Sequence, residues 1–169
     1  LKVFYNYLDT DFIKIIIGLR RCGKTTFLKS IIEELKGLGI ADENIIYISF
    51  ENVKYRYIKT SKELDEVVLD KVKDIEGKVY LLFDEIQLVD EWEESINSYR
   101  VSFDCDIYVT GSNSKLFSST IILPPSLEVK RIDRGVKITL YSGNKIEKSY
   151  ITAAFLSFVS FSDIIVINI

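Results

Sequence analysis

Hydrophobic residues in the first two-thirds of the chain fall into two alternating patterns. The first pattern is a short, almost continuously apolar run that ends in a polar or glycine-containing turn. Such runs predict strands that are buried on both faces of a sheet. They are IKIIIG at 13–18, NIIYISFE at 44–51, KVYLLFDE at 78–85 and CDIYVTGSN at 105–113.

The second pattern lies between these runs and places apolar residues at helical spacing. It predicts helices in TTFLKSIIEELKGLG (25–39), TSKELDEVVLDKVKDI (60–75) and EWEESINSYR (91–100). Thr60 and Ser61 are capping candidates for the second of these helices. Alternating buried strands and helices predict an α/β fold, with a mostly parallel sheet between two helical layers.

The pattern changes after about Ser119. The stretch LEVKRIDRGVKITLYSG (127–143) predicts a polar hairpin or a pair of edge strands, with a turn at Arg134 and Gly135. The residues from 149 to 169 carry a single charge, Asp163. Their length approaches that of a membrane span, but Asp163 and the scattered serines favour a buried helix or strand pair instead.

Composition places the chain among soluble globular proteins. It has 169 residues, of which 47% are hydrophobic and 28% charged, enough for one domain with a sizeable core. The net charge of −3 gives no general attraction to nucleic acid or to anionic membranes. Two cysteines, Cys22 and Cys105, are too few for a disulfide framework. We therefore expect a cytoplasmic protein. The sequence contains no methionine, even at position 1, which suggests an internal fragment.

The spacing Gly18-x-x-x-x-Gly23-Lys24-Thr25 directly follows the first predicted strand. It is typical of a phosphate-binding loop, in which backbone N–H groups at a helix start surround phosphate oxygens. Lys24 would reach the β- and γ-phosphates, and the Thr25 hydroxyl would bind Mg²⁺. The alternative is a basic surface turn with solvated arginines. The predicted nucleotide-contacting set is Gly18, Arg20, Arg21, Cys22, Gly23, Lys24, Thr25 and Thr26.

A second pattern is YLLFDE, an apolar strand that ends in Asp84 and Glu85. Ligands in open α/β sheets bind at the carboxyl ends of the strands, so Asp84 would face the phosphate loop. Asp84 would hold Mg²⁺ directly or through water, and Glu85 would orient or deprotonate an attacking water. The alternative is an acidic pair that only caps a helix.

A third pattern is DIYVTGSN, which ends in polar residues beside the predicted acids. A polar side chain at this strand end would hydrogen-bond the γ-phosphate or the water. Ser112 and Asn113 are the favoured candidates and Thr110 is another, but the sequence does not choose among them. An ordinary turn that uses Gly111, Ser112 and Asn113 is the alternative.

Together, these residues resemble a known family. IKIIIGLRRCGKTTFL, IIYISFEN, YLLFDEIQLVDEWEESINSYR and DIYVTGSNSKLFSS are similar to prokaryotic AAA-type P-loop ATPases of the group that carries a C-terminal domain of unknown function. The resemblance covers roughly Lys14 to Ser119. It implies ATP as the nucleotide, Mg²⁺ as the cofactor and hydrolysis as the reaction. It maps the phosphate loop onto Gly18 to Thr25, the Mg²⁺ acid onto Asp84, the catalytic glutamate onto Glu85 and the phosphate sensor onto Ser112 or Asn113. With the roles argued above for Lys24 and Thr25, we expect catalysis from Lys24, Glu85 and Ser112 or Asn113, and metal binding by Thr25 and Asp84.

The chain departs from the family pattern after KLFSS. The family continues with a Gly-Arg-Tyr-like stretch and a YPLSF-like strand, whereas this chain continues with TIILPPSLEVKRIDRG. We therefore expect a P-loop ATPase core at 1–119 and a divergent or truncated C-terminal segment at 120–169.

Other functions compete with ATP hydrolysis. A GTPase would need a guanine-reading Asn-Lys-x-Asp stretch, which the sequence lacks, and a small-molecule kinase would not need Glu85 beside Asp84. The main alternative is a nucleotide-dependent switch that binds ATP with little or no turnover. Nucleic-acid binding through Lys130 to Lys137 is less favoured than a solvated hairpin. A protein partner is expected but not identified, and the sequence does not indicate the oligomeric state.

Overall fold

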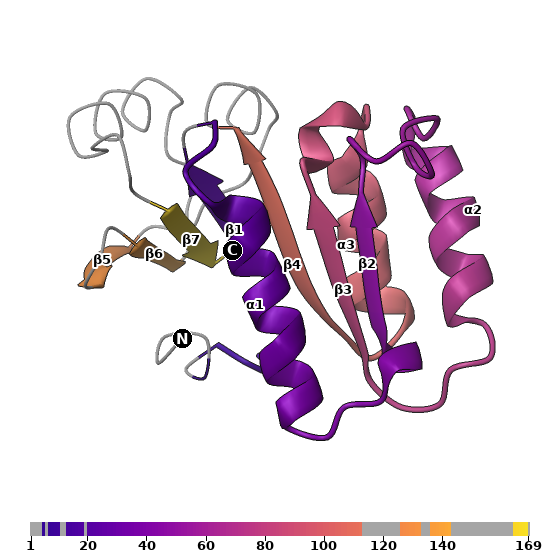
Figure 1. The fold of residues 1–169 in the computed structure, drawn as a ribbon, viewed down its shortest axis with the longest axis horizontal. Coiled ribbons are helices and arrows are strands. Elements are labelled where there is room, and N and C mark those ends of the chain that lie inside the picture. Colours follow the sequence, from indigo (N-terminus) through magenta and orange to yellow (C-terminus); the bar gives the residue numbers. More distant parts are fainter. Residues whose placement is uncertain are drawn as a thin grey trace.

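The structure is a computed structural model that describes residues 5, 7–10, 13–18, 20–112, 126–132, 136–142 and 164–168. In this part of the chain, seven strands form one sheet in the order β2-β3-β4-β1-β7-β6-β5 (Figure 1). The strands are β1 (Ile13–Gly18), β2 (Ile45–Ser49), β3 (Val79–Asp84), β4 (Cys105–Ser112), β5 (Ser126–Ile132), β6 (Val136–Ser142) and β7 (Ile164–Asn168).

The four strands predicted from apolar runs form the parallel part of this sheet. β1 pairs with β4, β4 with β3, and β3 with β2, all in parallel. Every residue of β3 is buried, as expected for a strand that is covered on both faces. The predicted α/β fold with a mostly parallel sheet is therefore confirmed for this part of the chain.

Three α-helices among the described residues cover the sheet: α1 (Lys24–Gly37), α2 (Ser61–Val72) and α3 (Trp92–Ser102). Short 3-10 turns, η2 (Asp42–Asn44) and η3 (Ile86–Leu88), precede β2 and follow β3. Thr60 caps α2 as predicted, since its side chain accepts the Glu63 N–H and the Glu63 carboxylate accepts the Thr60 N–H.

The core is divided by the sheet into two apolar clusters, which gives the three layers. One cluster joins the buried face of α1, including Leu28, Ile31 and Leu35, to one face of the sheet. The other joins α2 and α3 to the opposite face and is larger. Successive residues of β1 divide between the clusters, with Ile15 in the α2–α3 cluster and Ile16 in the α1 cluster.

The strands beyond β1 complete the sheet with mixed directions. β7 pairs antiparallel with β1, β6 pairs parallel with β7, and β5 pairs antiparallel with β6. The predicted pair of polar strands at 127–143 corresponds to β5 and β6, while its turn at Arg134 and Gly135 lies outside the described residues. Of the predicted buried tail at 149–169, the structure describes only β7. Within the described ranges, no helix has the length and apolarity needed to cross a membrane.

Candidate functional site

The predicted phosphate loop connects β1 to α1 at the carboxyl edge of the parallel strands. Gly23 is the N-cap of α1 and adopts a left-handed conformation with φ of 96°. Among the described residues, no side chain caps this helix start, and its first turn holds no acidic residue. The first N–H groups of α1 and its positive dipole end are therefore available to an anion.

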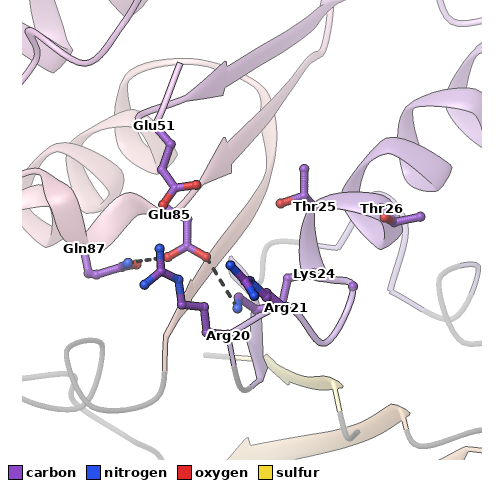
Figure 2. A pocket seen from close by; sticks show the side chains of 9 residues that line it. Arg20, Arg21, Lys24, Thr25, Thr26, Glu51, Glu85 and Gln87 are labelled. Atoms are coloured by element: carbon purple, nitrogen blue, oxygen red, sulfur yellow. Dashed lines mark hydrogen bonds and ion pairs between the residues drawn. The ribbon is translucent and has the colours of Figure 1, made fainter. Parts of the chain in front are cut away.

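A cavity of about 480 Å³ lies over this loop (Figure 2). Its volume falls within the range of small-ligand pockets. The lining residues come from the loop, from the start of α1 and from the segments after β2 and β3. They are Arg20, Arg21, Gly23, Lys24, Thr25, Thr26, Glu51, Glu85 and Gln87.

Most of the predicted nucleotide-contacting set lines this cavity. Cys22 packs against the apolar cluster under α1, and Gly18 ends β1 opposite Ser112 of β4. Glu51 and Gln87 line the cavity but were not predicted to do so. Gln87 could have been noticed in the sequence, because it lies two residues after Glu85.

Asp84 is the most heavily hydrogen-bonded carboxylate of the site. Thr25 Oγ1 lies 2.9 Å from Asp84 Oδ2 and 3.2 Å from Oδ1, and Thr110 Oγ1 donates to Oδ1 at 2.6 Å. The hydroxyls of Tyr47 and Ser49, on neighbouring β2, lie 3.3 and 3.4 Å from Oδ2. Burial, together with the charge of Asp84, raises the pKa of Tyr47 to about 12, so that its hydroxyl keeps its proton.

The hydroxyl of Thr25 and the carboxylate of Asp84 fit a magnesium ion. Both offer hard oxygen ligands, and they meet where the phosphate loop joins α1. Mg²⁺ in phosphate sites usually takes only one or two protein ligands and keeps several waters. It therefore does not require a dense acidic cluster, and the described residues contain no group of three or more His, Cys, Asp or Glu that could hold a metal.

Lys24 and Glu85 face each other across the cavity. Lys24 is only 4% exposed, and its Nζ lies 3.4 Å from Glu85 Oε1. The second oxygen of Glu85, Oε2, accepts a hydrogen bond from Gln87 Nε2 at 2.5 Å. The backbone of Glu85 adopts a left-handed conformation, with φ of 59°. The chain turns there from β3 into η3.

Thr110 connects the two acidic residues from the adjacent strand. Its hydroxyl donates to Asp84 and accepts the backbone N–H of Glu85 at 3.0 Å. The structure thus brings Thr110, the further candidate of the sequence analysis, into the site. Asn113 lies outside the described residues, and Ser112 is described only as backbone at the end of β4. Their predicted roles remain predictions.

Parallel strands with a Gly-Lys-Thr run where β1 leads into α1, and an acidic pair at the end of β3, are typical of P-loop nucleotide-binding domains. The family model described as AAA domain matches residues 10–133 of the chain. The chain belongs to this AAA-domain family of nucleotide-binding proteins.

Two curated relatives share much of the chain. An uncharacterized protein of Haemophilus influenzae is 37% identical over 147 residues, which are 85% of this chain and 37% of the relative. The uncharacterized protein MJ1544 of Methanocaldococcus jannaschii is 39% identical over 109 residues, which are 64% of this chain and 23% of the relative. The chain thus spans well under half the length of both proteins. No solved structure matches it significantly.

Proposed function

We propose that this chain binds ATP with Mg²⁺ and hydrolyses it to ADP and phosphate. The observation that carries the proposal is that Lys24 and Thr25, at the start of α1, line one cavity together with Glu85, and that Asp84, at the end of β3, contacts Thr25. Membership of the AAA-domain family supports a nucleotide as the ligand.

Each of these residues has a distinct proposed role. Lys24 and the N–H groups at the start of α1 would hold the phosphate oxygens, and the exposed Arg20 and Arg21 would add positive charge at the rim of the cavity. Thr25 and Asp84 would hold Mg²⁺, which neutralises charge that develops on the phosphates. Thr110 would keep the Asp84 carboxylate and the Glu85 backbone in place.

Glu85 would act on the attacking water. The Oε1 atom of Glu85 lies 3.4 Å from Lys24 Nζ, so this oxygen is at the phosphate-binding side of the cavity. A carboxylate in this place can accept a proton from water as the water attacks the γ-phosphate. Because phosphoryl transfer needs little covalent chemistry from the protein, most of the rate would come from positioning and charge neutralisation.

One observation favours a second candidate, a switch that binds ATP with little turnover. Both carboxylate oxygens of Glu85 have protein partners, Lys24 on one side and Gln87 on the other. Turnover requires Lys24 to give up Glu85 for the phosphates. If it does not, the chain would bind the nucleotide without hydrolysing it.

The first test is calorimetric binding of a non-hydrolysable ATP analogue to the 169-residue chain, with Mg²⁺ and with EDTA. Lys24→Ala should weaken binding about 10- to 100-fold, because it removes charge-assisted hydrogen bonds to phosphate. Lys29→Ala, at an exposed position on the same helix, is the matched control and should bind normally. A folded wild-type chain with no saturable binding would overturn the proposal.

Turnover then separates the hydrolase from the switch. The wild-type chain should release phosphate from ATP, and Glu85→Gln should bind the analogue normally but lose most of this activity. Equal, negligible phosphate release by both proteins, with normal binding, would favour the switch.

A further inference from the structure

Gln87 contacts Glu85 from a rigid part of the site. It lies in the middle of η3, where Leu88 N–H donates to the Glu85 carbonyl at 3.1 Å and Val89 N–H donates to the Ile86 carbonyl at 3.0 Å. Ile86 and Val89 anchor the turn in the α2–α3 cluster. Gln87 therefore starts from a fixed backbone, and its side chain reaches back to the cavity (Figure 2).

The orientation of the Gln87 amide follows from its partner. A carboxylate only accepts hydrogen bonds, so the amide nitrogen must face Glu85 Oε2 and the amide oxygen must point away. That oxygen, Gln87 Oε1, is buried and has no hydrogen-bond partner among the described residues. An amide that served only to fill space would not keep a buried oxygen unsatisfied. The amide of Gln87 thus keeps its hydrogen bond to Glu85 although its own oxygen has no partner among the described residues.

The two carboxylate oxygens of Glu85 therefore have different partners. Oε2 is held by Gln87 at 2.5 Å, and Oε1 lies on the side of Lys24, at 3.4 Å. The backbone of Glu85 is fixed separately, because its N–H donates to Thr110 Oγ1. With the backbone and one oxygen held, the carboxylate has little freedom to rotate, and Oε1 remains directed at the phosphate loop.

We propose that Gln87 is a positioning residue for Glu85, which it holds so that Oε1 accepts the proton of the attacking water. This role rests on the proposed ATP hydrolysis. In that step the water oxygen forms a bond to the γ-phosphorus while a water proton passes to Glu85 Oε1. The bond from the γ-phosphorus to the bridging oxygen breaks, and its electron pair leaves with ADP. Gln87 takes no proton and acts only through Glu85.

The contact can be tested without any enzymatic activity, because Gln87 is the only glutamine in the sequence. A chain labelled with ¹⁵N in the glutamine side chain gives one amide pair by NMR. One proton of this pair should resonate downfield and exchange slowly in the wild-type chain. Glu85→Ala should abolish both features, whereas Glu51→Ala, which removes another carboxylate of the same cavity, should keep them. An unchanged signal in Glu85→Ala would overturn the proposal.

The positioning role itself is tested by the kinetics of Gln87→Leu and Gln87→Glu. Gln87→Leu should lower kcat about 10- to 100-fold while KM and the affinity for the analogue change less than about twofold. In Gln87→Glu, two neighbouring carboxylates resist ionising together, so the acidic limb of the kcat profile should move up by about one pH unit. That shift would show that the ionisation of Glu85 limits kcat, whereas the loss of kcat without a change in KM is what a purely structural role of Gln87 would not produce. Asn97→Asp, which adds a carboxylate at an exposed position of α3, is the matched control and should leave the profile unchanged.

The outcomes separate this proposal from the one on which it rests. If the wild-type chain hydrolyses ATP and Gln87→Leu keeps full kcat, the positioning role is wrong and the hydrolase proposal stands. If the wild-type chain binds the analogue but releases no phosphate, hydrolysis and the positioning role both fail, whatever the amide signal shows.

Discussion

Gly23 combines a backbone conformation that favours glycine with open space beside the chain. Its φ of 96° belongs to the left-handed region, which residues with a Cβ rarely adopt. Among the described residues, a Cβ built on Gly23 would nevertheless meet no atom within 4 Å. Packing against the protein therefore does not exclude a side chain here, whereas the backbone conformation does. The open space beside this backbone is where phosphate oxygens would approach the N–H groups of α1.

Gly23→Ala should consequently lose nucleotide affinity as well as stability. The strained φ should cost about 1 kcal/mol, measurable by urea unfolding. The matched control is Gly39→Ala, because Gly39 has φ of 87°, equally open surroundings and a position at the far end of α1. Both variants should lose similar stability, but only Gly23→Ala should weaken binding of the ATP analogue. Equal binding by the two variants would contradict phosphate contact at Gly23.

Individual site residues differ in how well the sequence could predict them. The meeting of Lys24 with Glu85 and of Thr25 with Asp84 was predictable, because their spacing and their place after apolar runs match a site for phosphate and Mg²⁺. Thr110 was harder to choose among its polar neighbours. Its contact with both acidic residues depends on the register of β4 against β3, which places Val109 opposite Phe83. Register is a property of paired strands and is not visible in either strand alone.

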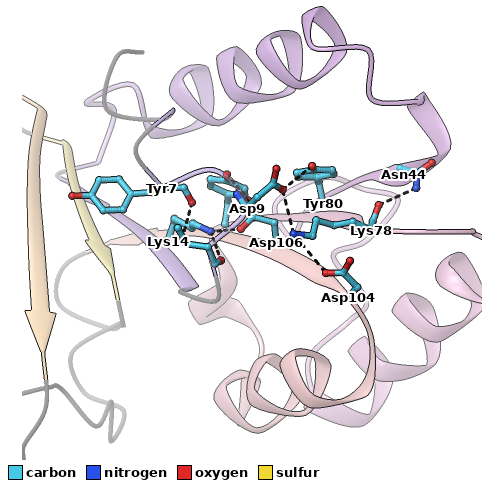
Figure 3. A network of polar contacts seen from close by, with 10 residues as sticks. Tyr7, Asp9, Lys14, Asn44, Lys78, Tyr80, Asp104 and Asp106 are labelled. Carbon is cyan, nitrogen blue, oxygen red and sulfur yellow. Dashed lines mark hydrogen bonds and ion pairs between the residues drawn. The ribbon is translucent and has the colours of Figure 1, made fainter.

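A second polar cluster ties β1 to β4 at the amino ends of the strands, away from the phosphate loop (Figure 3). Lys14 of β1 and Asp106 of β4 are each 1% exposed and form an ion pair. Tyr108 Oη and the Asp9 N–H donate to Asp106 Oδ2, and Lys14 also donates to the Thr10 carbonyl. Burial lowers the pKa of Lys14 from its ordinary value, while the charge of Asp106 opposes this shift.

Removing one member of this pair should therefore destabilise the chain far more than removing both. Lys14→Met or Asp106→Leu alone leaves a buried charge without its partner and should cost about 3–5 kcal/mol. The double variant should recover much of this loss, because no uncompensated charge remains. Urea unfolding of all four proteins measures the coupling. As a control, Lys78→Met, at a partly exposed ion pair, should cost less than about 1 kcal/mol. Additive losses at Lys14 and Asp106 would contradict the coupling.

The same pair shows why the sequence predicts an element but not the contacts that the element makes. The run IKIIIG predicts a buried strand, and β1 has those bounds. The pattern gives no reason for a lysine within it, because the partner of Lys14 lies 92 residues away on β4. Apolar periodicity indicates that an element is buried, whereas the compensation of a buried charge depends on which strands become neighbours.

The order of strands in the sheet decides where the site lies. β4 is inserted between β1 and β3, so the phosphate loop after β1 and the acidic pair after β3 flank Thr110 of β4. The sequence predicted parallel strands but not this order, since alternating strands and helices are compatible with several arrangements. The antiparallel pairing of β7 with β1 was likewise not predictable from the apolar tail alone.

Because the site draws on α1, β3 and β4, bound nucleotide should stabilise the whole parallel part of the sheet. At a concentration 100 times its Kd, a ligand adds about 2.7 kcal/mol to the free energy of unfolding. For a chain of this size, that corresponds to a rise in Tm of about 5–11 °C. Calorimetric scans should show this rise for the wild-type chain with the Mg²⁺-bound analogue. For Lys24→Ala, whose affinity is expected to be about 10- to 100-fold weaker, the rise at the same concentration should be only about 1–6 °C.

The number of thermal unfolding transitions shows whether the parallel strands and β5–β7 unfold together. β1 forms part of both apolar clusters and also pairs with β7, so the parallel strands and β5–β7 share one hydrogen-bonded sheet. If they unfold together, the nucleotide should shift a single transition as a whole. Two transitions, of which only one moves with nucleotide, would instead show that the site unfolds independently of β5–β7. The boundary expected near residue 119 would then separate two units of stability as well as two kinds of sequence.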